Sequence, residues 1–313
     1  MDNSRRNFIK KATATGAAIL AAPAVFGSAA ASKQQKATDA TAPFKLKYAP
    51  SIGMFREHAG REIIDNIKFC YDMGFRAMFD NGLMGRPVED QVKLANEMQR
   101  LGMELGPFVL MGAAPASFVL NKPEIRETLV NKMKEGVEVT KRTGVKWALV
   151  VPGNYDMRLH MDYQTANVID NLRYCCEVME PAGLTIVLEP LNTLRNHPGL
   201  FLTGMPQSYA ICRGVNSPFC KIVDDIYHQQ ITEGNLIPNI EAAWSEIAAF
   251  HLGDNPGRNE PTTGEINYKN IFKYIYSRKY EGVLCMEHGI SNRTKEGEAR
   301  VIQAYRECDS FEA

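Results

Sequence analysis

The feature that most constrains this chain is a regular alternation of strand-like and helix-like segments that begins at residue 46. The strand-like segments are short apolar runs bounded by turn residues, which is typical of buried strands. The helix-like segments carry apolar residues at helical spacing, and several end before a glycine. The predicted strands span residues 46–52, 75–79, 103–111, 147–151, 184–189, 220–225, 246–252 and 282–287. The predicted helices span residues 61–73, 88–101, 123–143, 162–179, 205–213, 238–244, 267–277 and 294–307.

The number of strand–helix units distinguishes between two kinds of α/β fold. Eight units occupy about 265 residues, close to the roughly 250 residues of a closed eight-fold barrel. An open doubly wound sheet usually has about five or six strands and a glycine-rich first turn, but no GxGxxG follows residues 46–52. We therefore predict a single (β/α)8 barrel, whose functional groups lie at the C-terminal ends of the strands.

The N-terminus has a different character from the rest of the chain. A charged segment at residues 4–10 contains the pair Arg5-Arg6, and an apolar, alanine-rich run follows at residues 12–25. Small residues then occupy positions 28–31. A charged start, a short apolar middle and a small-residue cleavage region are typical of a secretory signal, and the arginine pair resembles the twin-arginine type. A membrane anchor is the alternative, but the run is short for spanning a bilayer.

These features predict three parts of the chain. Residues 1–31 are predicted to be a twin-arginine-type signal peptide, residues 32–43 a linker and residues 44–313 the barrel. Such a signal implies recognition by the twin-arginine export machinery and a location in the periplasm. Because this machinery carries folded proteins, a metal can be loaded before export.

Composition excludes some partners. Lys+Arg and Asp+Glu both number 36, so the formal net charge is zero, without the basic excess expected of a nucleic-acid-binding protein. The seven cysteines are odd in number and form no CxxC pair, so buried free thiols are predicted rather than a disulfide framework. We expect a small-molecule substrate, and homo-oligomerisation remains open.

Metal-binding or acid/base side chains follow four successive predicted strands in the second half of the chain. A lone carboxylate in such a position is more often a loop anchor, and a lone histidine is more often part of the core. Several carboxylates buried together, however, require a counter-charge, and a divalent cation is the simplest one. Such a set of donors suits Mn²⁺, Mg²⁺, Co²⁺ or Zn²⁺. The candidates are Glu189, then Asp224 and Asp225, then His251 and Asp254, and finally Glu287.

Four motifs carry a resemblance to a known family. They are Ile186-Val-Leu-Glu-Pro-Leu-Asn192, Asp225-Ile-Tyr-His-Gln-Gln230, His251-Leu-Gly-Asp-Asn-Pro-Gly-Arg258 and Thr263-Gly-Glu-Ile-Asn-Tyr268. They resemble hydroxypyruvate isomerase-type proteins of the xylose isomerase-like barrel superfamily, which also contains the D-tagatose 3-epimerase group. Outside the four motifs, the resemblance consists of the alternation of strands and helices over about residues 46–308.

The resemblance implies one divalent metal ion held by four strand-end residues. Asp225 is preferred to Asp224 because it directly precedes Ile-Tyr-His. The implied metal ligands are Glu189, Asp225, His251 and Glu287.

The resemblance also implies roles in catalysis. Glu189 and Glu287 are the implied catalytic residues, moving a proton of the substrate through a metal-bound enediolate. His228 and Arg258 resemble substrate-contacting positions. The expected activity is therefore a divalent-metal-dependent isomerase of a small hydroxy-carbonyl compound or sugar.

Two alternatives remain open. Export from the cytoplasm and the histidine at position 251 favour a ketose 3-epimerase or a keto-sugar lyase, because hydroxypyruvate isomerases often carry glutamine there. A non-catalytic sugar-binding barrel is the other alternative, since a barrel can keep its pocket after losing its chemistry.

Overall fold

The computed structural model describes residues 41–113 and 118–312. The predicted signal peptide and most of the predicted linker lie outside these ranges. All seven cysteines lie inside them and are buried free thiols, as predicted. Among the helices within the described ranges, none combines the length and the apolar character needed to cross a membrane.

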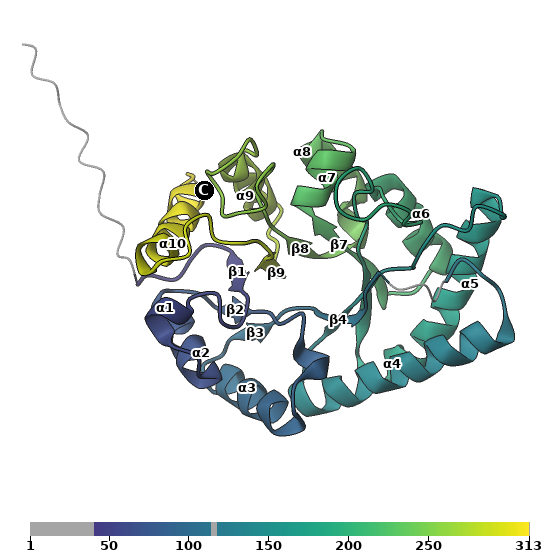
Figure 1. The fold of residues 1–313 in the computed structure, drawn as a ribbon, viewed down its shortest axis with the longest axis horizontal. Coiled ribbons are helices and arrows are strands. Elements are labelled where there is room, and N and C mark those ends of the chain that lie inside the picture. Colours follow the sequence, from purple (N-terminus) through teal and green to yellow (C-terminus); the bar gives the residue numbers. More distant parts are fainter. Residues whose placement is uncertain (1–40, 114–117, 313) are drawn as a thin grey trace, which may run out of the picture. The chain divides into compact units, whose positions relative to one another are not determined.

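The strands are parallel and follow the predicted order along the chain. Seven of them form one sheet in the order β1-β9-β8-β7-β6-β5-β4, and β2 pairs with β3. Figure 1 shows the helices arranged outside these strands. The strands are β1 Lys47–Pro50, β2 Ala77–Met78, β3 Glu104–Leu105, β4 Phe108–Met111, β5 Trp147–Val150, β6 Thr185–Leu188, β7 Cys220–Asp225, β8 Ile247–His251 and β9 Val283–Met286.

Backbone hydrogen bonds next to the β2–β3 pair connect it to the two edges of the larger sheet. On the β1 side, Phe79 N–H donates to Pro50 O at 3.1 Å and Ile52 N–H donates to Phe79 O at 3.2 Å. On the β4 side, Val109 N–H donates to Asn81 O at 3.2 Å. The strand positions therefore follow one another around a closed barrel, which confirms the predicted fold class.

Each predicted helix is present, with boundaries that shift by a few residues. For example, α4 begins with Pro123 in its first turn, and Gly144 ends it in the left-handed conformation at φ +69°, a position that suits glycine. The α-helices are α1 Arg56–Ala59, α2 Ile63–Asp72, α3 Val88–Arg100, α4 Pro123–Thr143, α5 Met161–Met179, α6 Met205–Val215, α7 Ile226–Thr232, α8 Leu236–Ala243, α9 Tyr268–Ser277 and α10 Lys295–Asp309. The 3₁₀ turns are η2 Leu83–Gly85, η3 Glu180–Ala182 and η4 Trp244–Glu246.

The structure adds two short helices, α1 and α7, that the sequence pattern did not predict. It also divides the predicted strand 103–111 into β3 and β4 around Gly106 and Pro107. A Cβ atom at Gly106 would lie 3.0 Å from both Cys285 Sγ and Phe79 Cβ. This close packing inside the barrel explains the glycine.

Alternate residues of the strands belong to two different apolar clusters. Val187, Val223, Ala249 and Cys285 belong to a small cluster contributed by strands around the barrel. Their neighbours along the strands, such as Ile186, pack in the larger cluster that includes the helices. Because strand side chains alternate between faces, the smaller cluster is the barrel interior.

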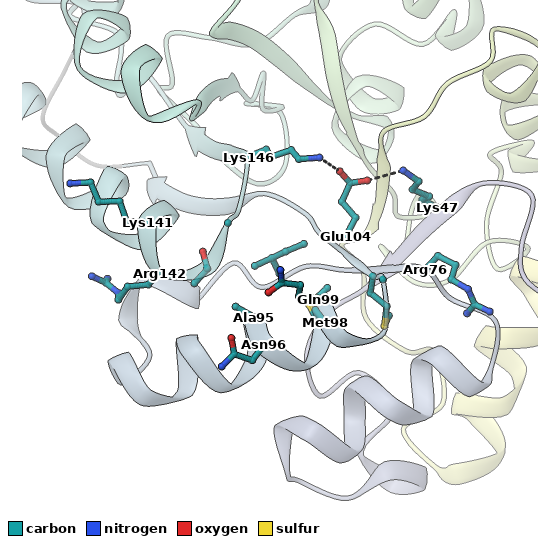
Figure 2. Close-up of a pocket in the computed structure, with 15 residues that line it drawn as sticks. Lys47, Arg76, Ala95, Asn96, Met98, Gln99, Glu104, Lys141, Arg142 and Lys146 are labelled. Carbon is teal, nitrogen blue, oxygen red and sulfur yellow. Dashed lines mark hydrogen bonds and ion pairs between the residues drawn. The ribbon is translucent and has the colours of Figure 1, made fainter.

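Glu104 holds two lysines at the N-terminal end of the barrel. Its carboxylate accepts hydrogen bonds from Lys47 Nζ and Lys146 Nζ, both at 2.8 Å, in a hollow also lined by α3 and the end of α4 (Figure 2). Burial alone would raise the pKa of Glu104, but the hydrogen bonds and charges of Lys146 and Lys47 lower it. This end of a barrel typically contributes to stability rather than to chemistry.

The Glu104→Gln substitution tests this contribution. A depressed pKa in the folded state stabilises the fold above the unfolded pKa of glutamate, about 4.3. That stability is lost as the pH falls through the folded pKa. We expect the substitution to lower the free energy of unfolding by about 1 kcal/mol at pH 7, and by less than half of that at pH 3, measured by urea denaturation. The control is Glu138→Gln, because Glu138 pairs with Lys141 on an exposed helix face. Equal effects of Glu104→Gln at both pH values would contradict the assignment.

Candidate active site

The interior face of four neighbouring strands continues into a group of polar residues. Two residues beyond the interior positions Val187, Val223, Ala249 and Cys285, the same face reaches a carboxylate or an imidazole. We call this group the four-residue cluster, which consists of Glu189, Asp225, His251 and Glu287. The side chains therefore meet because the four strands are parallel neighbours whose interior faces end at the same mouth of the barrel.

The ligand atoms of the four-residue cluster lie close together. One ligand atom from each residue lies within 4.8 Å of the others. His251 Nδ1 is 2.9 Å from Glu189 Oε1 and 3.1 Å from Glu287 Oε2. Glu189, Asp225 and His251 are buried, with 5%, 1% and 0% of their surface exposed, so little water is available to solvate their charges.

The same periodicity explains which of two adjacent aspartates belongs to the cluster. Asp225 lies on the interior face, and its neighbour Asp224 is absent from the cluster, because successive side chains point to opposite faces. Burial, together with the charges of Asp225 and Glu233, raises the pKa of Asp224 to about 8.

Asp225 also begins a helix. Its Oδ1 accepts hydrogen bonds from the main-chain N–H groups of Tyr227, at 2.9 Å, and His228, at 3.2 Å, and so caps α7. Its other oxygen, Oδ2, lies 3.1 Å from Arg258 Nη2 and 3.6 Å from His228 Nε2. The two capping hydrogen bonds to Oδ1 hold the Asp225 carboxylate in one orientation, in which Oδ2 faces the other residues of the cluster.

Asp254, the other acidic candidate near β8, has a different role. Its Oδ1 accepts from the N–H groups of Asn255, at 2.9 Å, and Ile266, at 3.0 Å, and its Oδ2 accepts from Gly264 N–H at 2.8 Å. Asp254 therefore anchors the loop that follows β8.

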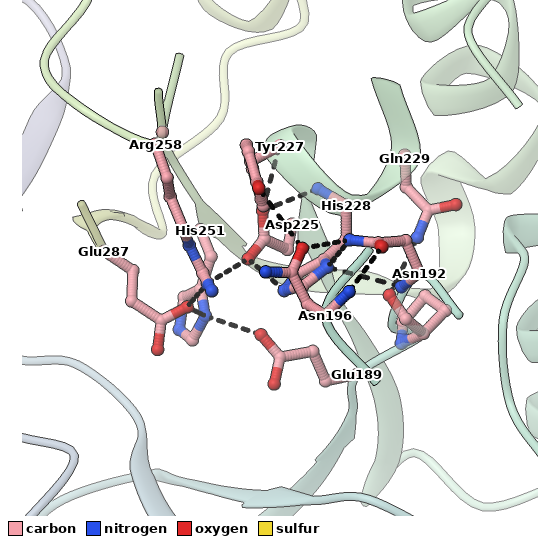
Figure 3. A network of polar contacts seen from close by, with 12 residues as sticks. Glu189, Asn192, Asn196, Asp225, Tyr227, His228, Gln229, His251, Arg258 and Glu287 are labelled. Carbon is pink, nitrogen blue, oxygen red and sulfur yellow. Dashed lines mark hydrogen bonds and ion pairs between the residues drawn. The ribbon is translucent and has the colours of Figure 1, made fainter. Parts of the chain in front are cut away.

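That loop brings Arg258 to the cluster. Arg258 Nη2 donates to Glu287 Oε2 at 2.8 Å and to Asp225 Oδ2 at 3.1 Å. The guanidinium also lies over the ring of Tyr227, 4.9 Å from its centroid. Arg258 is thus a cation shared by two carboxylates, as Figure 3 shows.

His228 is held by the network on the other side of Asp225 (Figure 3). Its Nδ1 accepts from the main-chain N–H of Asn192 at 3.3 Å, so the proton of the neutral ring is on Nε2. Burial lowers the pKa of His228 to about 4, which keeps the ring neutral near pH 7. Its Nε2 is buried and has no hydrogen-bond partner among residues 41–113 and 118–312. His228 therefore offers an unused N–H donor beside Asp225.

The network around His228 has its own supports. Asn192 Oδ1 accepts from the main-chain N–H groups of Arg195, at 3.0 Å, and Asn196, at 3.2 Å, which directs Asn192 Nδ2 toward His228. Tyr227 Oη donates to Asn196 Oδ1 at 3.2 Å. Sequence reasoning assigned no role to Asn192 or Tyr227.

The carboxylates of the cluster differ in their electrostatic surroundings. Burial, and next the charge of Glu287, raise the pKa of Glu189 to about 7. Burial would also raise the pKa of Glu287, but His251 and Arg258 lower it below its ordinary value. Although burial disfavours a charged imidazole, Glu287 and Glu189 raise the pKa of His251. Neighbouring groups thus stabilise charge on Glu287 and His251, while burial and Glu287 disfavour charge on Glu189.

The donor set fits a divalent cation. Three carboxylates and one imidazole are ligands that Mn²⁺, Mg²⁺, Co²⁺ and Zn²⁺ accept, with the imidazole favouring the transition metals. Adjacent ligand atoms about 2.0–2.2 Å from one ion are roughly 2.8–3.6 Å apart. The separations of 2.9 and 3.1 Å at His251 Nδ1 fall in this range.

One further residue of the site was missed. Asn81 lies two residues beyond Phe79, an interior residue, and its Nδ2 donates to Glu287 Oε1. The two-residue periodicity that places Glu189 and Glu287 at the barrel mouth would have predicted Asn81 there as well.

The fold and the site define a class of barrel protein, and a family model shows which one. The model described as "Xylose isomerase-like TIM barrel" matches residues 67–308. The chain belongs to this family.

Two curated relatives are similar to the chain over part of its length. Hydroxypyruvate isomerase of Escherichia coli (strain K12) is 36% identical over 142 residues, covering 45% of this chain and 54% of the relative. The 2-oxo-tetronate isomerase of Cupriavidus necator is 32% identical over 123 residues, covering 39% of this chain and 47% of the relative. The chain therefore spans about half the length of these relatives.

Solved structures share the fold at low sequence identity. An apo 3-keto-D-glucoside 4-epimerase from E. coli has a TM-score of 0.68 and 18% identity, over 85% of this chain and 100% of the other. The IOLI protein, solved with a zinc atom, has a TM-score of 0.65 and 18% identity, over 84% of this chain and 96% of the other. At this low sequence identity, the two structures show that the chain shares their fold and nothing beyond it.

The position of Arg258 generates a prediction about cation binding. The guanidinium of Arg258 contacts Asp225 and Glu287, two of the four candidate metal ligands. Its positive charge therefore repels a metal ion that binds at the same place. We expect Arg258→Gln to bind Mn²⁺ at least tenfold more tightly than the unmodified protein in calorimetry without substrate. The control is Arg278→Gln, because Arg278 packs over Trp244. Equal or weaker Mn²⁺ binding by Arg258→Gln would contradict the geometry.

Proposed function

We propose that the protein is a divalent-metal-dependent isomerase of a small hydroxy-carbonyl compound or sugar. The observation that carries the proposal is the four-residue cluster, in which three carboxylates and an imidazole from adjacent strands converge within 4.8 Å. The similarity to hydroxypyruvate isomerase and to 2-oxo-tetronate isomerase supports a substrate of this class.

A divalent cation at the four-residue cluster would act as a Lewis acid toward a carbonyl oxygen and the neighbouring hydroxyl oxygen. The zinc atom in the IOLI structure, a barrel of the same fold, supports the proposal of a metal here. Mn²⁺, Mg²⁺, Co²⁺ and Zn²⁺ all remain candidates.

The two glutamates are proposed to move the substrate's proton. Glu189 and Glu287 both contact His251 Nδ1, at 2.9 and 3.1 Å, so a substrate beside His251 has a carboxylate on each side. One glutamate accepts the carbon-bound proton, a proton is then delivered to the adjacent carbon, and the hydroxyl proton passes to the former carbonyl oxygen. General acid–base catalysis requires groups within hydrogen-bond reach of the reacting atoms.

The remaining polar groups are proposed to bind the substrate. The Nε2–H of His228 is buried beside Asp225 without a hydrogen-bond partner in the described part of the chain. It is suited to donate to a substrate oxygen that gains negative charge. Arg258 is half-buried, with 29% of its side chain exposed, and suits a carboxylate or hydroxyl group of the substrate.

Substitution of either glutamate tests the proposed chemistry. With Mn²⁺ bound and hydroxypyruvate as the probe, we expect Glu189→Gln and Glu287→Gln to slow exchange of the carbon-bound proton with D₂O at least 100-fold. Exchange is followed by ¹H NMR, and chelation of the metal is expected to abolish it. The control is Glu265→Gln, on the loop after β8, where Glu265 accepts from Asn255 Nδ2. Unchanged exchange in both cluster variants would refute the mechanism.

Epimerisation is the second candidate, because carboxylates on both sides of a substrate can also serve opposite faces of one carbon. A panel of ketoses in D₂O distinguishes the two reactions. Deuterium at C1 or C2 indicates isomerisation, whereas deuterium at C3 indicates 3-epimerisation. Sugar binding without turnover or bound metal would instead indicate a non-catalytic barrel.

We also propose that the protein is exported to the periplasm by the twin-arginine machinery, on the basis of Arg5-Arg6 and the apolar run at residues 12–25. In cell fractionation, the double substitution Arg5→Lys and Arg6→Lys is expected to leave the protein in the cytoplasm, since the signal depends on the arginine pair. The control Lys10→Arg preserves the charge outside the pair and should be exported. Cytoplasmic retention of the unmodified protein would contradict this proposal.

A further inference from the structure

Asn81 is held at the barrel mouth by its main chain. The main-chain carbonyl of Asn81 accepts a hydrogen bond from Val109 N–H at 3.2 Å. Two residues earlier, Phe79 N–H donates to Pro50 O of β1 at 3.1 Å. Asp80 orders the following turn by accepting from Gly82 N–H at 3.1 Å. The Asn81 side chain therefore starts from a fixed point beside Glu287 of the four-residue cluster.

The chemistry of Glu287 determines which way the Asn81 amide faces. The side chain of Asn81 contacts Glu287 Oε1, and an ionised carboxylate can only accept hydrogen bonds. The amide nitrogen must therefore face Glu287, and the amide oxygen must face away from it. The other oxygen of Glu287, Oε2, lies 2.8 Å from Arg258 Nη2 and 3.1 Å from His251 Nδ1.

Asn81 Oδ1 is a buried acceptor that lacks a hydrogen-bond donor within residues 41–113 and 118–312. A buried amide oxygen without a donor is unfavourable, and such groups usually have partners. The donor that the proposed substrate class brings to this position is a hydroxyl group.

We propose that Asn81 is a positioning residue for Glu287 that also binds a substrate hydroxyl through Oδ1. This inference rests on the proposed function. The Nδ2 donor holds Glu287 Oε1, which leaves Oε2 directed toward His251 and Arg258. The same amide then places a substrate hydroxyl next to Glu287, one of the two glutamates proposed to move the proton.

Two variants of similar size separate these roles. Asn81→Asp keeps an acceptor oxygen but, when ionised, cannot donate to Glu287, whereas Asn81→Leu removes both functions. With Mn²⁺ and hydroxypyruvate, we expect kcat to fall at least tenfold in both variants. KM should rise at least tenfold in Asn81→Leu and stay within threefold in Asn81→Asp. The control is Asn96→Leu, at an exposed position on α3, which should change neither constant.

A crystal structure of Asn81→Leu tests the positioning role without activity. The Glu287 carboxylate is expected to rotate away from its contacts with Arg258 and His251. An unchanged carboxylate together with unchanged kcat and KM would overturn the proposal. If the unmodified protein neither binds Mn²⁺ nor turns over hydroxypyruvate or any sugar of the panel, the proposed function fails. The crystal structure still decides whether Asn81 positions Glu287.

Discussion

The crowding of three carboxylates, two of them buried, around one imidazole is the constraint on which the rest of the site depends. Separately, Glu189, Asp225 and Glu287 would each be unfavourable in a barrel interior, and together they repel one another. The surrounding structure supplies positive charge and N–H donors to them. Two main-chain N–H groups and Arg258 contact Asp225, while His251 lies between the two glutamates. A divalent cation bound by the four residues would supply the same positive charge from a single centre.

The two ends of the barrel use carboxylates in opposite ways. At the N-terminal end, Glu104 is satisfied by Lys47 and Lys146, and its pKa is lowered. At the mouth, burial and the charge of Glu287 raise the pKa of Glu189 to about 7. Within the mouth, the pKa of Glu189 is raised and that of Glu287 is lowered, and carboxylates with pKa values displaced in opposite directions at one site are a common arrangement for acid–base chemistry. This contrast places the candidate chemistry at the C-terminal ends of the strands.

Much of the fold could be predicted because apolar periodicity is a local property of the sequence. The strands and most helices follow from it, and the choice of Asp225 over Asp224 agrees with the interior face of β7. Helix α7 was missed because its start depends on the Asp225 cap rather than on an apolar pattern. Asn81 was missed although it has the same two-residue relation to the interior as Glu189 has. Its contact with Glu287 joins positions 206 residues apart, and no local pattern reports such a pairing.

The central claim is that one cation is shared by Glu189, Asp225, His251 and Glu287. The most direct measurement is a crystal structure of the protein soaked in Mn²⁺, with anomalous scattering recorded to locate the metal. The account predicts a single anomalous peak about 2.0–2.4 Å from a ligand atom of each of the four residues. A peak elsewhere, or the absence of any peak at saturating Mn²⁺, would contradict it.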